Sequence, residues 1–292
     1  MKLKYIDEIR SSVSIYYSKM ASNLLDGTYK SFYKGKSMNF ENLREYVIND
    51  DVKDIDWKAS ARSGSLLIKQ FIAEKKHNIM LIMDTGVKMD ADTSAHESKK
   101  KVALYSSGTL GYLAIKNGDY VGMSYMKNDK VIYKPFSYNL YNLEEYLCEY
   151  DKNGTIKSNK SDLNDTIEFI YRNINKKMSL FIFTDIEGLN KLNRRLIKEI
   201  SRVHDVLILN IEDNFLIGND IWDVEKNDYL PPLLLNDKKM HEVEMDIRNS
   251  IYNRNATELK KYDIPIMTIN SLKAVPIKII KLLEEYRYAH KS

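Results

Sequence analysis

Cysteine, glycine and proline are all scarce in this sequence of 292 residues. The single cysteine, Cys148, excludes a disulfide within the chain and is typical of a reducing compartment. With only 11 glycines and 5 prolines, the chain is neither collagen-like nor of low complexity. No apolar run approaches the roughly 20 residues of a membrane-spanning helix, and residues 1–8 lack the apolar core of a signal peptide. We therefore expect a cytoplasmic protein without a transmembrane segment.

The excess of positive over negative charge is also small. Lys and Arg number 45 and Asp and Glu 41, so the formal net charge is +4, and the two signs are interspersed. So small an excess does not indicate a nucleic-acid partner. The 21 tyrosines are spread along the chain and do not accompany a basic patch. We expect no nucleic acid among the partners.

The apolar residues after residue 77 are arranged in short, continuous runs. These runs occupy residues 79–83, 180–183, 206–209 and 264–267. Continuous rather than alternating runs are typical of strands that are buried on both faces of a parallel sheet. Helical patterns lie between the runs or after them, at 98–116, 162–175, 192–203, 243–262 and 275–288. The predicted fold class is therefore α/β: a doubly wound, mostly parallel, Rossmann-like sheet with helices on both faces.

Other segments complete this picture. Residues 120–133 predict a β-hairpin, which places an antiparallel strand at the edge of the sheet. Apolar residues at spacings of three and four between residues 6 and 24 predict an amphipathic N-terminal helix. The pattern that follows is irregular and predicts a small β-rich region. We divide the chain into an N-terminal helix with a charged region, residues 1–76, and an α/β domain, residues 77–292.

Several motifs of catalysis and cofactor binding are missing. Gly35-Lys36-Ser37 resembles the end of a phosphate-binding loop, but Lys30 occupies the position of that loop's first glycine. The sequence has no H-E-x-x-H, and its five histidines show no metal-ligand spacing. It also has no G-x-S-x-G around a nucleophilic serine. None of these classes of enzyme is indicated.

Two aspartates follow neighbouring apolar runs. Asp84 directly follows the run 79–83, and Asp185 follows the run 180–183 after one threonine. Ligands of open α/β sheets bind beyond the carboxyl ends of the strands, and two carboxylates with a hydroxyl suit a hard cation such as Mg²⁺. Each aspartate could instead cap the helix that follows it, which on pattern alone is the commoner role. Both interpretations stay open at this point.

The charged region contains a long and specific pattern. Residues 40–46 have the sequence F-E-N-L-R-E-Y, and residues 50–62 have the sequence D-D-V-K-D-I-D-W-K-A-S-A-R. Together they resemble the signature of the bacterial domain of unknown function 58 family, F-x-x-x-R-x-Y-x-x-G-D-D-x-R-x-I-D-W-x-x-S-A-R. Asn49 stands where the family has glycine, and Lys53 where it usually has arginine. The resemblance weakens after about Asn214.

The resemblance implies a von Willebrand factor type A-like fold with a metal-ion-dependent adhesion site, D-x-S-x-S, at the carboxyl edge of its sheet. Asp84 matches the first position, but Gly86 and Lys88 replace the two serines. Ser161 matches the threonine of a second loop, and Asp185 matches the aspartate of a third. The metal ligands carried over are therefore Asp84, Ser161 and Asp185, in a degenerate site. We expect no cofactor and leave Mg²⁺ open. Either the Lys88 ammonium takes the place of the cation, or Lys88 points to solvent and the site is empty.

The same resemblance implies a function. Members of the family are expected to work beside MoxR-type AAA+ ATPases in the assembly or activation of other proteins. We accordingly expect a non-enzymatic protein-interaction or adaptor module. The alternative is a metal-dependent phosphoester hydrolase that uses Asp84 and Asp185. Peripheral association with a membrane stays open.

Overall fold

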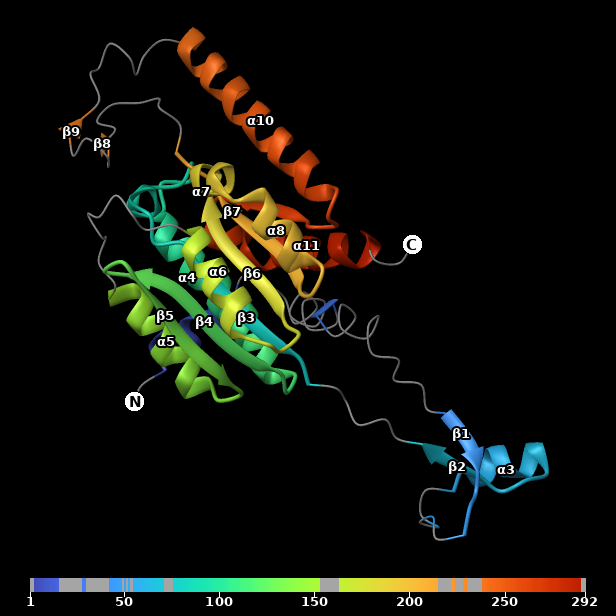
Figure 1. Cartoon of the computed structure of the whole chain (residues 1–292). Coiled ribbons are helices and arrows are strands. Elements are labelled where there is room, and N and C mark those ends of the chain that lie inside the picture. The colour runs from blue at the N-terminus through green and yellow to red at the C-terminus, as the bar shows by residue number, and fades with distance from the viewer. Residues whose placement is uncertain are drawn as a thin grey trace.

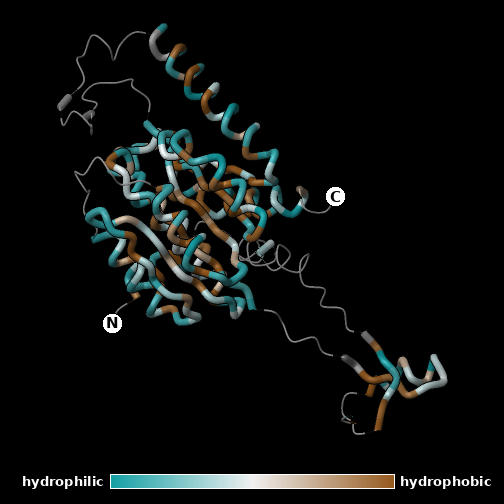
Figure 2. Tube along the Cα trace, in the orientation of Figure 1, coloured by the Kyte–Doolittle hydropathy of each residue, from teal (hydrophilic) through white to brown (hydrophobic). Residues whose placement is uncertain are grey.

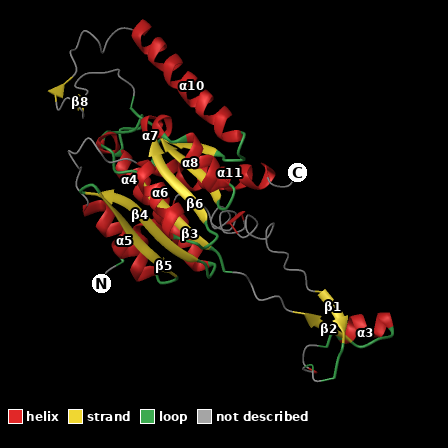
Figure 3. Ribbon diagram, viewed as in Figure 1, coloured by secondary structure: helices red, strands yellow, loops and turns green. Residues whose placement is uncertain are grey.

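A computed structural model describes residues 3–15, 28–29, 42–48, 50, 52, 55–70, 76–152, 163–214, 222–223, 228–229 and 238–289. Its largest element is a six-stranded sheet between helices (Figures 1 and 3). The strands are β3 (Asn78–Met83), β4 (Tyr120–Lys127), β5 (Lys130–Ser137), β6 (Ser179–Asp185), β7 (Asp205–Ile211) and β10 (Ile266–Ile269). All neighbours are parallel except β4 and β5, which pair antiparallel.

The strand order shows how the sheet is wound. The order is β10-β7-β6-β3-β4-β5. The chain builds outward from β3 to β5, returns to the middle of the sheet, and builds outward again from β6 to β10. The winding therefore reverses between β3 and β6, which is where doubly wound sheets bind ligands. The predicted fold class, with its antiparallel edge strand, is confirmed.

Helices cover both faces of this sheet. One layer contains α1 (Lys4–Ile15), α4 (Lys99–Lys116), α5 (Leu140–Lys152) and α11 (Val275–Ala289). The other contains α6 (Leu163–Asn173), α7 (Ile186–Lys191), α8 (Arg194–Ser201) and part of α10 (Lys238–Lys260). Along β3, Leu81 packs in the first layer, and Met80 and Ile82 pack in the second. The strand is continuously apolar because both of its faces are buried. In Figure 2 the hydrophobic colours gather toward the middle of the α/β domain.

Helix α4 lies beside the sheet, with α1 and α5 packed against it, and most of its side chains are buried. Two of its glycines permit this close packing. A Cβ at Gly111 would lie 2.8 Å from Cδ1 of Leu143 on α5. A Cβ at Gly108 would overlap Ile9 of α1 and lie 3.1 Å from Leu147 of α5. Side chains at these positions would therefore push α1 and α5 away from α4.

A buried glutamate fixes the start of α1. Glu144 of α5 has no exposed surface, and its two carboxylate oxygens accept hydrogen bonds from the backbone N–H groups of Tyr5, at 3.0 Å, and Ile6, at 2.9 Å. These N–H groups belong to the first turn of α1 and have no partner within the helix. The phenolic oxygen of Tyr5 also donates to Oδ2 of Asp151, at 2.6 Å. Helix α1 thus packs on the α/β domain, and the division of the chain at residue 76 stays a prediction.

The charged region contains a small β-rich unit of its own, as expected. Strand β1 (Asn42–Glu45) pairs antiparallel with β2 (Leu67–Gln70), and α3 (Trp57–Ser63) lies between them in the chain. Arg44 makes a two-pronged ion pair with Asp50, both distances being 2.6 Å. Asp56 caps α3 by accepting from the N–H groups of Lys58 and Ala59. This unit is therefore held by backbone pairing, a helix cap and one ion pair.

Two further features complete the description. Strands β8 (Trp222–Asp223) and β9 (Asp228–Tyr229) form a separate two-stranded antiparallel pair. Among the described residues, none of the helices combines the length and apolar character needed to cross a bilayer.

The capping role of Glu144 predicts the effect of its removal. Glu144→Gln keeps the shape of the side chain but turns an amide N–H₂ toward one of the two backbone donors. We expect the free energy of unfolding to fall by about 1–2 kcal/mol, because a charged cap at a helix N-terminus is lost. Urea denaturation measures this change. Glu145→Gln, at the exposed neighbouring position, is the matched control, and an equal loss in both variants would contradict the capping role.

Candidate functional site

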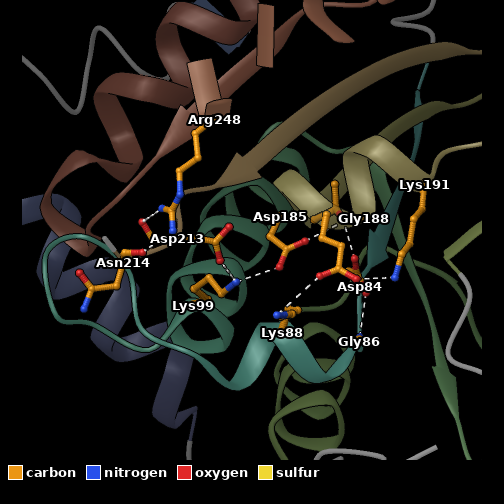
Figure 4. Close-up of polar contacts among 12 residues, drawn as sticks. Asp84, Gly86, Lys88, Lys99, Asp185, Gly188, Lys191, Asp213, Asn214 and Arg248 are labelled. Carbon is orange, nitrogen blue, oxygen red and sulfur yellow. Dashed lines mark hydrogen bonds and ion pairs between the residues drawn. The ribbon is translucent and has the colours of Figure 1, made fainter. Parts of the chain in front are cut away.

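The sheet brings Asp84 and Asp185 together where the winding reverses. Asp84 directly follows β3, and Asp185 ends β6, the strand paired with β3. The backbone N–H of Asp84 donates to the carbonyl of Phe183, at 2.9 Å, so the register of the two strands is kept to their ends. Both aspartates are almost completely buried. The structure therefore places these two side chains at one site, as the sequence predicts, and Figure 4 shows the site.

Both carboxylate oxygens of Asp84 accept hydrogen bonds from the protein. Oδ1 accepts from the backbone N–H of Gly86, at 2.8 Å, and Oδ2 accepts from the hydroxyl of Thr184, at 2.6 Å. Gly188 packs against this pair so closely that a Cβ there would overlap Thr184 Oγ1 and Asp84 Oδ2. The carbonyl of Asp84 accepts from the phenol of Tyr150, at 3.0 Å. Asp84 is therefore locked in one orientation by its neighbours.

Asp185 has two roles. Its Oδ1 accepts from the backbone N–H of Gly188, at 2.9 Å, and so caps the short helix α7. Its Oδ2 accepts from the ammonium of Lys99, at 2.8 Å. The capping interpretation left open by the sequence is therefore correct for Asp185, but it accounts for only one of the two oxygens.

Lys99 is the functional residue that the sequence analysis missed. It begins α4, and its side chain has no exposed surface. Its ammonium donates to Asp185 and also to Asp213, which follows β7 (Figure 4). In the sequence, Lys99 is the first of three consecutive lysines, which resemble a solvated charge run. However, lysines at the start of a helix interact unfavourably with the helix dipole. This conflict is a signal in the sequence that one of the three lysines could be buried beside carboxylates.

Asp213 connects this site to the edge of the second layer. Arg248 of α10 donates to the backbone carbonyls of Asp213, at 3.1 Å, and Asn214, at 2.7 Å. The N–H of Asn214 in turn donates to the carbonyl of Asp92, in the loop between β3 and α4, at 2.9 Å. The loops after β3 and β7 are therefore bonded to each other and to α10.

Burial and charge together set the protonation of these groups. Burial, and then the negative charge of Asp185, raise the pKa of Asp84 to about 6. Burial likewise raises the pKa of Asp213, although Lys99 beside it acts in the opposite direction. For Lys99, burial lowers the pKa, but the two carboxylates outweigh burial and the pKa is raised. Lys99 is therefore charged at neutral pH.

Lys88 lies at a different place from the one predicted. It belongs to the 3₁₀ helix η2 (Val87–Asp90), and its Nζ is 3.9 Å from Oε2 of Glu187 on α7. Lys191 forms a second ion pair with the same glutamate. The turn of η2 carries Lys88 toward the partly exposed rim of α7, whereas the first residue of α4 points into the crevice. The buried ammonium beside Asp185 is thus that of Lys99, and Lys88 lies beside Glu187 instead.

The remaining predicted ligands fit a divalent cation poorly. Ser161 lies outside the described residues. Gly86 and Lys88 supply no hydroxyl oxygen, and every carboxylate oxygen of Asp84 and Asp185 already accepts a hydrogen bond, one of them from an ammonium. Within the described part of the chain, no group of three or more His, Cys, Asp or Glu side chains is arranged to hold a metal. The donor set therefore does not match the oxygen shell that Mg²⁺ requires.

The raised pKa of Asp84 predicts a pH dependence of stability. Its pKa is 3.8 when unperturbed and about 6 in the folded protein. Between these values only the folded state holds the proton, so this contribution to stability is present at low pH and is lost as the pH rises through 6. Asp84→Asn removes the titration. We expect the stability of the wild type relative to Asp84→Asn to fall by about 2–3 kcal/mol between about pH 4 and pH 7.

Urea denaturation across this pH range measures the effect. Asp129→Asn, in the exposed turn between β4 and β5, is the control and should keep the response of the wild type. A difference between wild type and Asp84→Asn that does not change with pH would contradict the prediction.

Comparisons with known proteins find several similar solved structures and one family. Among solved structures, the conserved hypothetical protein BatB from Bacteroides thetaiotaomicron is similar at 14% identity, over 73% of this chain and 99% of that chain, with a TM-score of 0.47. An aerotolerance-related membrane protein from Bacteroides fragilis is similar at 15% identity, over 72% and 99%, with a TM-score of 0.46. A von Willebrand factor type A protein from Catenulispora acidiphila is similar at 10% identity, over 76% and 44%, with a TM-score of 0.38.

A search of curated protein sequences gives no match. A family model described as "Protein of unknown function DUF58" matches residues 42–216, more than half of the chain. The match includes both the charged region and the strands that carry Asp84 and Asp185. The chain therefore belongs to the DUF58 family.

Proposed function

We propose that this chain is a non-enzymatic protein-interaction module whose carboxyl-edge loops contact a partner protein. The observation that carries the proposal is the internal pairing of the crevice. The carboxylates of Asp84 and Asp185 are engaged by backbone N–H groups, a hydroxyl and the Lys99 ammonium. A general base or nucleophile needs a lone pair directed at a substrate. These buried carboxylates are instead directed at the protein.

The loops at this edge are bonded to one another, which favours a preformed binding surface. Ser94 donates to Glu212 after β7, at 2.6 Å, and Glu97 accepts from the N–H of Leu272 after β10, at 2.6 Å. The edge is thus joined across the sheet, and little conformational freedom remains to be lost when a partner binds. The exposed rim carries Lys88, Glu187 and Lys191, whose charges can direct a partner.

We propose a MoxR-type AAA+ ATPase as this partner, in the assembly or activation of other proteins. The support for this identity is the family resemblance, and a cytoplasmic location belongs to the same proposal. The poor fit of Asp84 and Asp185 to a metal supports a contact that needs no cofactor. The alternative, a phosphoester hydrolase using Asp84 and Asp185, would need these carboxylates free to hold metal ions. Their hydrogen bonds weigh against it.

Co-purification tests the proposed partner. The chain should form a complex with the MoxR-type ATPase of its own organism at micromolar concentrations, with an affinity that differs between ATP and ADP. Lys191→Glu, on the rim of the carboxyl edge, should weaken the complex by about tenfold, because it reverses a charge in the contact. Lys176→Glu, an exposed lysine before β6 at the opposite edge, is the matched control.

Three results would contradict the proposal. The first is the absence of any complex with either nucleotide. The second is an equal loss of affinity in both lysine variants, which would move the contact away from the carboxyl edge. The third is metal-dependent hydrolysis of p-nitrophenyl phosphate that disappears in Asp84→Asn and Asp185→Asn, which would favour the hydrolase.

A further inference from the structure

The group of aspartates at the carboxyl edge already has a cation that belongs to the protein. The Lys99 side chain is completely buried, and its ammonium is bonded to Asp185 and Asp213 (Figure 4). It reaches these carboxylates from α4, so that the cation and its partners come from α4, from β6 and from the loop after β7. An ammonium has three donors and no acceptor. The ammonium can therefore bridge two carboxylates as a metal ion does, but it has no lone pair with which to bind a metal ion.

We propose that Lys99 is a built-in cation that takes the place of a divalent metal between the aspartates of the carboxyl edge, so that the site is metal-independent. The geometry does not allow the Lys99 ammonium and a divalent metal ion to occupy this site at the same time. The Nζ of Lys99 lies 2.8 Å from Oδ2 of Asp185, the oxygen that would otherwise be available to a metal. A divalent ion bound between Asp84 and Asp185 would meet this ammonium at short range in a buried site, where repulsion between like charges is weakly screened.

The charge of the site explains why the cation is needed. Asp84 and Asp185 are buried, the side chain of Asp213 is 20% exposed, and Lys99 bonds directly to the carboxylates of Asp185 and Asp213. Arg248 contacts the loop through backbone carbonyls of Asp213 and Asn214. Without Lys99, Oδ2 of Asp185 and Oδ1 of Asp213 would lose the partner that they share, and carboxylate oxygens are the ligands that hard divalent cations prefer. Removing the ammonium should therefore free these two oxygens for a divalent cation, while the oxygens of Asp84 stay hydrogen-bonded to Gly86 and Thr184.

One consequence of this inference rests on the proposed function: the binding of the partner should be insensitive to chelators. The substitution itself is tested on the isolated protein. Failure to find a partner would therefore leave it intact, and failure of the metal experiment would leave the interaction proposal intact.

The first measurement uses the wild-type protein. Titration with Mn²⁺, followed by the electron paramagnetic resonance signal of the free ion, should show no binding at submillimolar concentrations. The melting temperature should be the same in millimolar Mg²⁺ and in EDTA. Submillimolar binding of Mn²⁺ with Lys99 in place, or a melting temperature that rises with Mg²⁺, would overturn the proposal.

The second measurement uses Lys99→Met, which keeps the length of the side chain and removes its charge. In EDTA this variant should melt roughly 10 °C below the wild type, because buried carboxylates lose their partner. Millimolar Mg²⁺ or Mn²⁺ should recover several degrees of this loss, because a ligand of the folded state stabilises it. Mn²⁺ binding should become measurable and should disappear again when Asp185→Asn is added.

Lys88→Met is the matched control, because it removes an ammonium from the rim and leaves Lys99 in place. It should gain no metal binding. Metal binding by Lys88→Met, or a folded Lys99→Met that binds no metal, would overturn the proposal. If Lys99→Met does not fold, the titration of the wild-type protein still tests the proposal. Binding of Mn²⁺ to the wild type contradicts a built-in cation, and the absence of Mn²⁺ binding supports one.

Discussion

A buried ammonium joins three segments of the chain at the carboxyl edge of this fold. Lys99, at the start of α4, pairs with Asp185 at the end of β6 and with Asp213 after β7. Arg248 then joins α10 to the same loop. Because an unpaired buried charge costs several kcal/mol, these elements keep the relative positions in which the ammonium is paired. The ion pairs thus determine the geometry of the edge, whatever binds to it.

The sheet and the meeting of two aspartates could be predicted because each depends on a signal within short stretches of sequence. A strand buried on both faces has to be apolar at every position, as residues 79–83 are, and this pattern needs no knowledge of the neighbours. The proximity of Asp84 and Asp185 then follows from the parallel arrangement, since carboxyl ends of parallel strands share one edge. The DUF58 signature added the family, which the apolar pattern alone does not give.

The partners of these aspartates could not be predicted, because they depend on contacts between distant residues. Lys99 and Asp213 are separated by 114 positions, and Glu144 is separated from Tyr5 by 139. Lys88 was chosen because it occupies a motif position, but the turn of η2 directs it to Glu187 instead. The direction of a flexible side chain is set by the turn that carries it and by the partners within reach, and the sequence encodes neither locally.

The antiparallel edge strand has a consequence for how this molecule meets others. The register of β5 against β4 shifts opposite Gly122, between residues 121 and 123, and Pro135 lies in this irregular stretch of β5. Proline lacks a backbone N–H, and a bulge disturbs the regular row of donors and acceptors that another strand would need. The carbonyl of Pro135 is also taken by the phenol of Tyr146, at 2.9 Å. This edge therefore resists both aggregation and the addition of a strand from a partner, which favours recognition by loops.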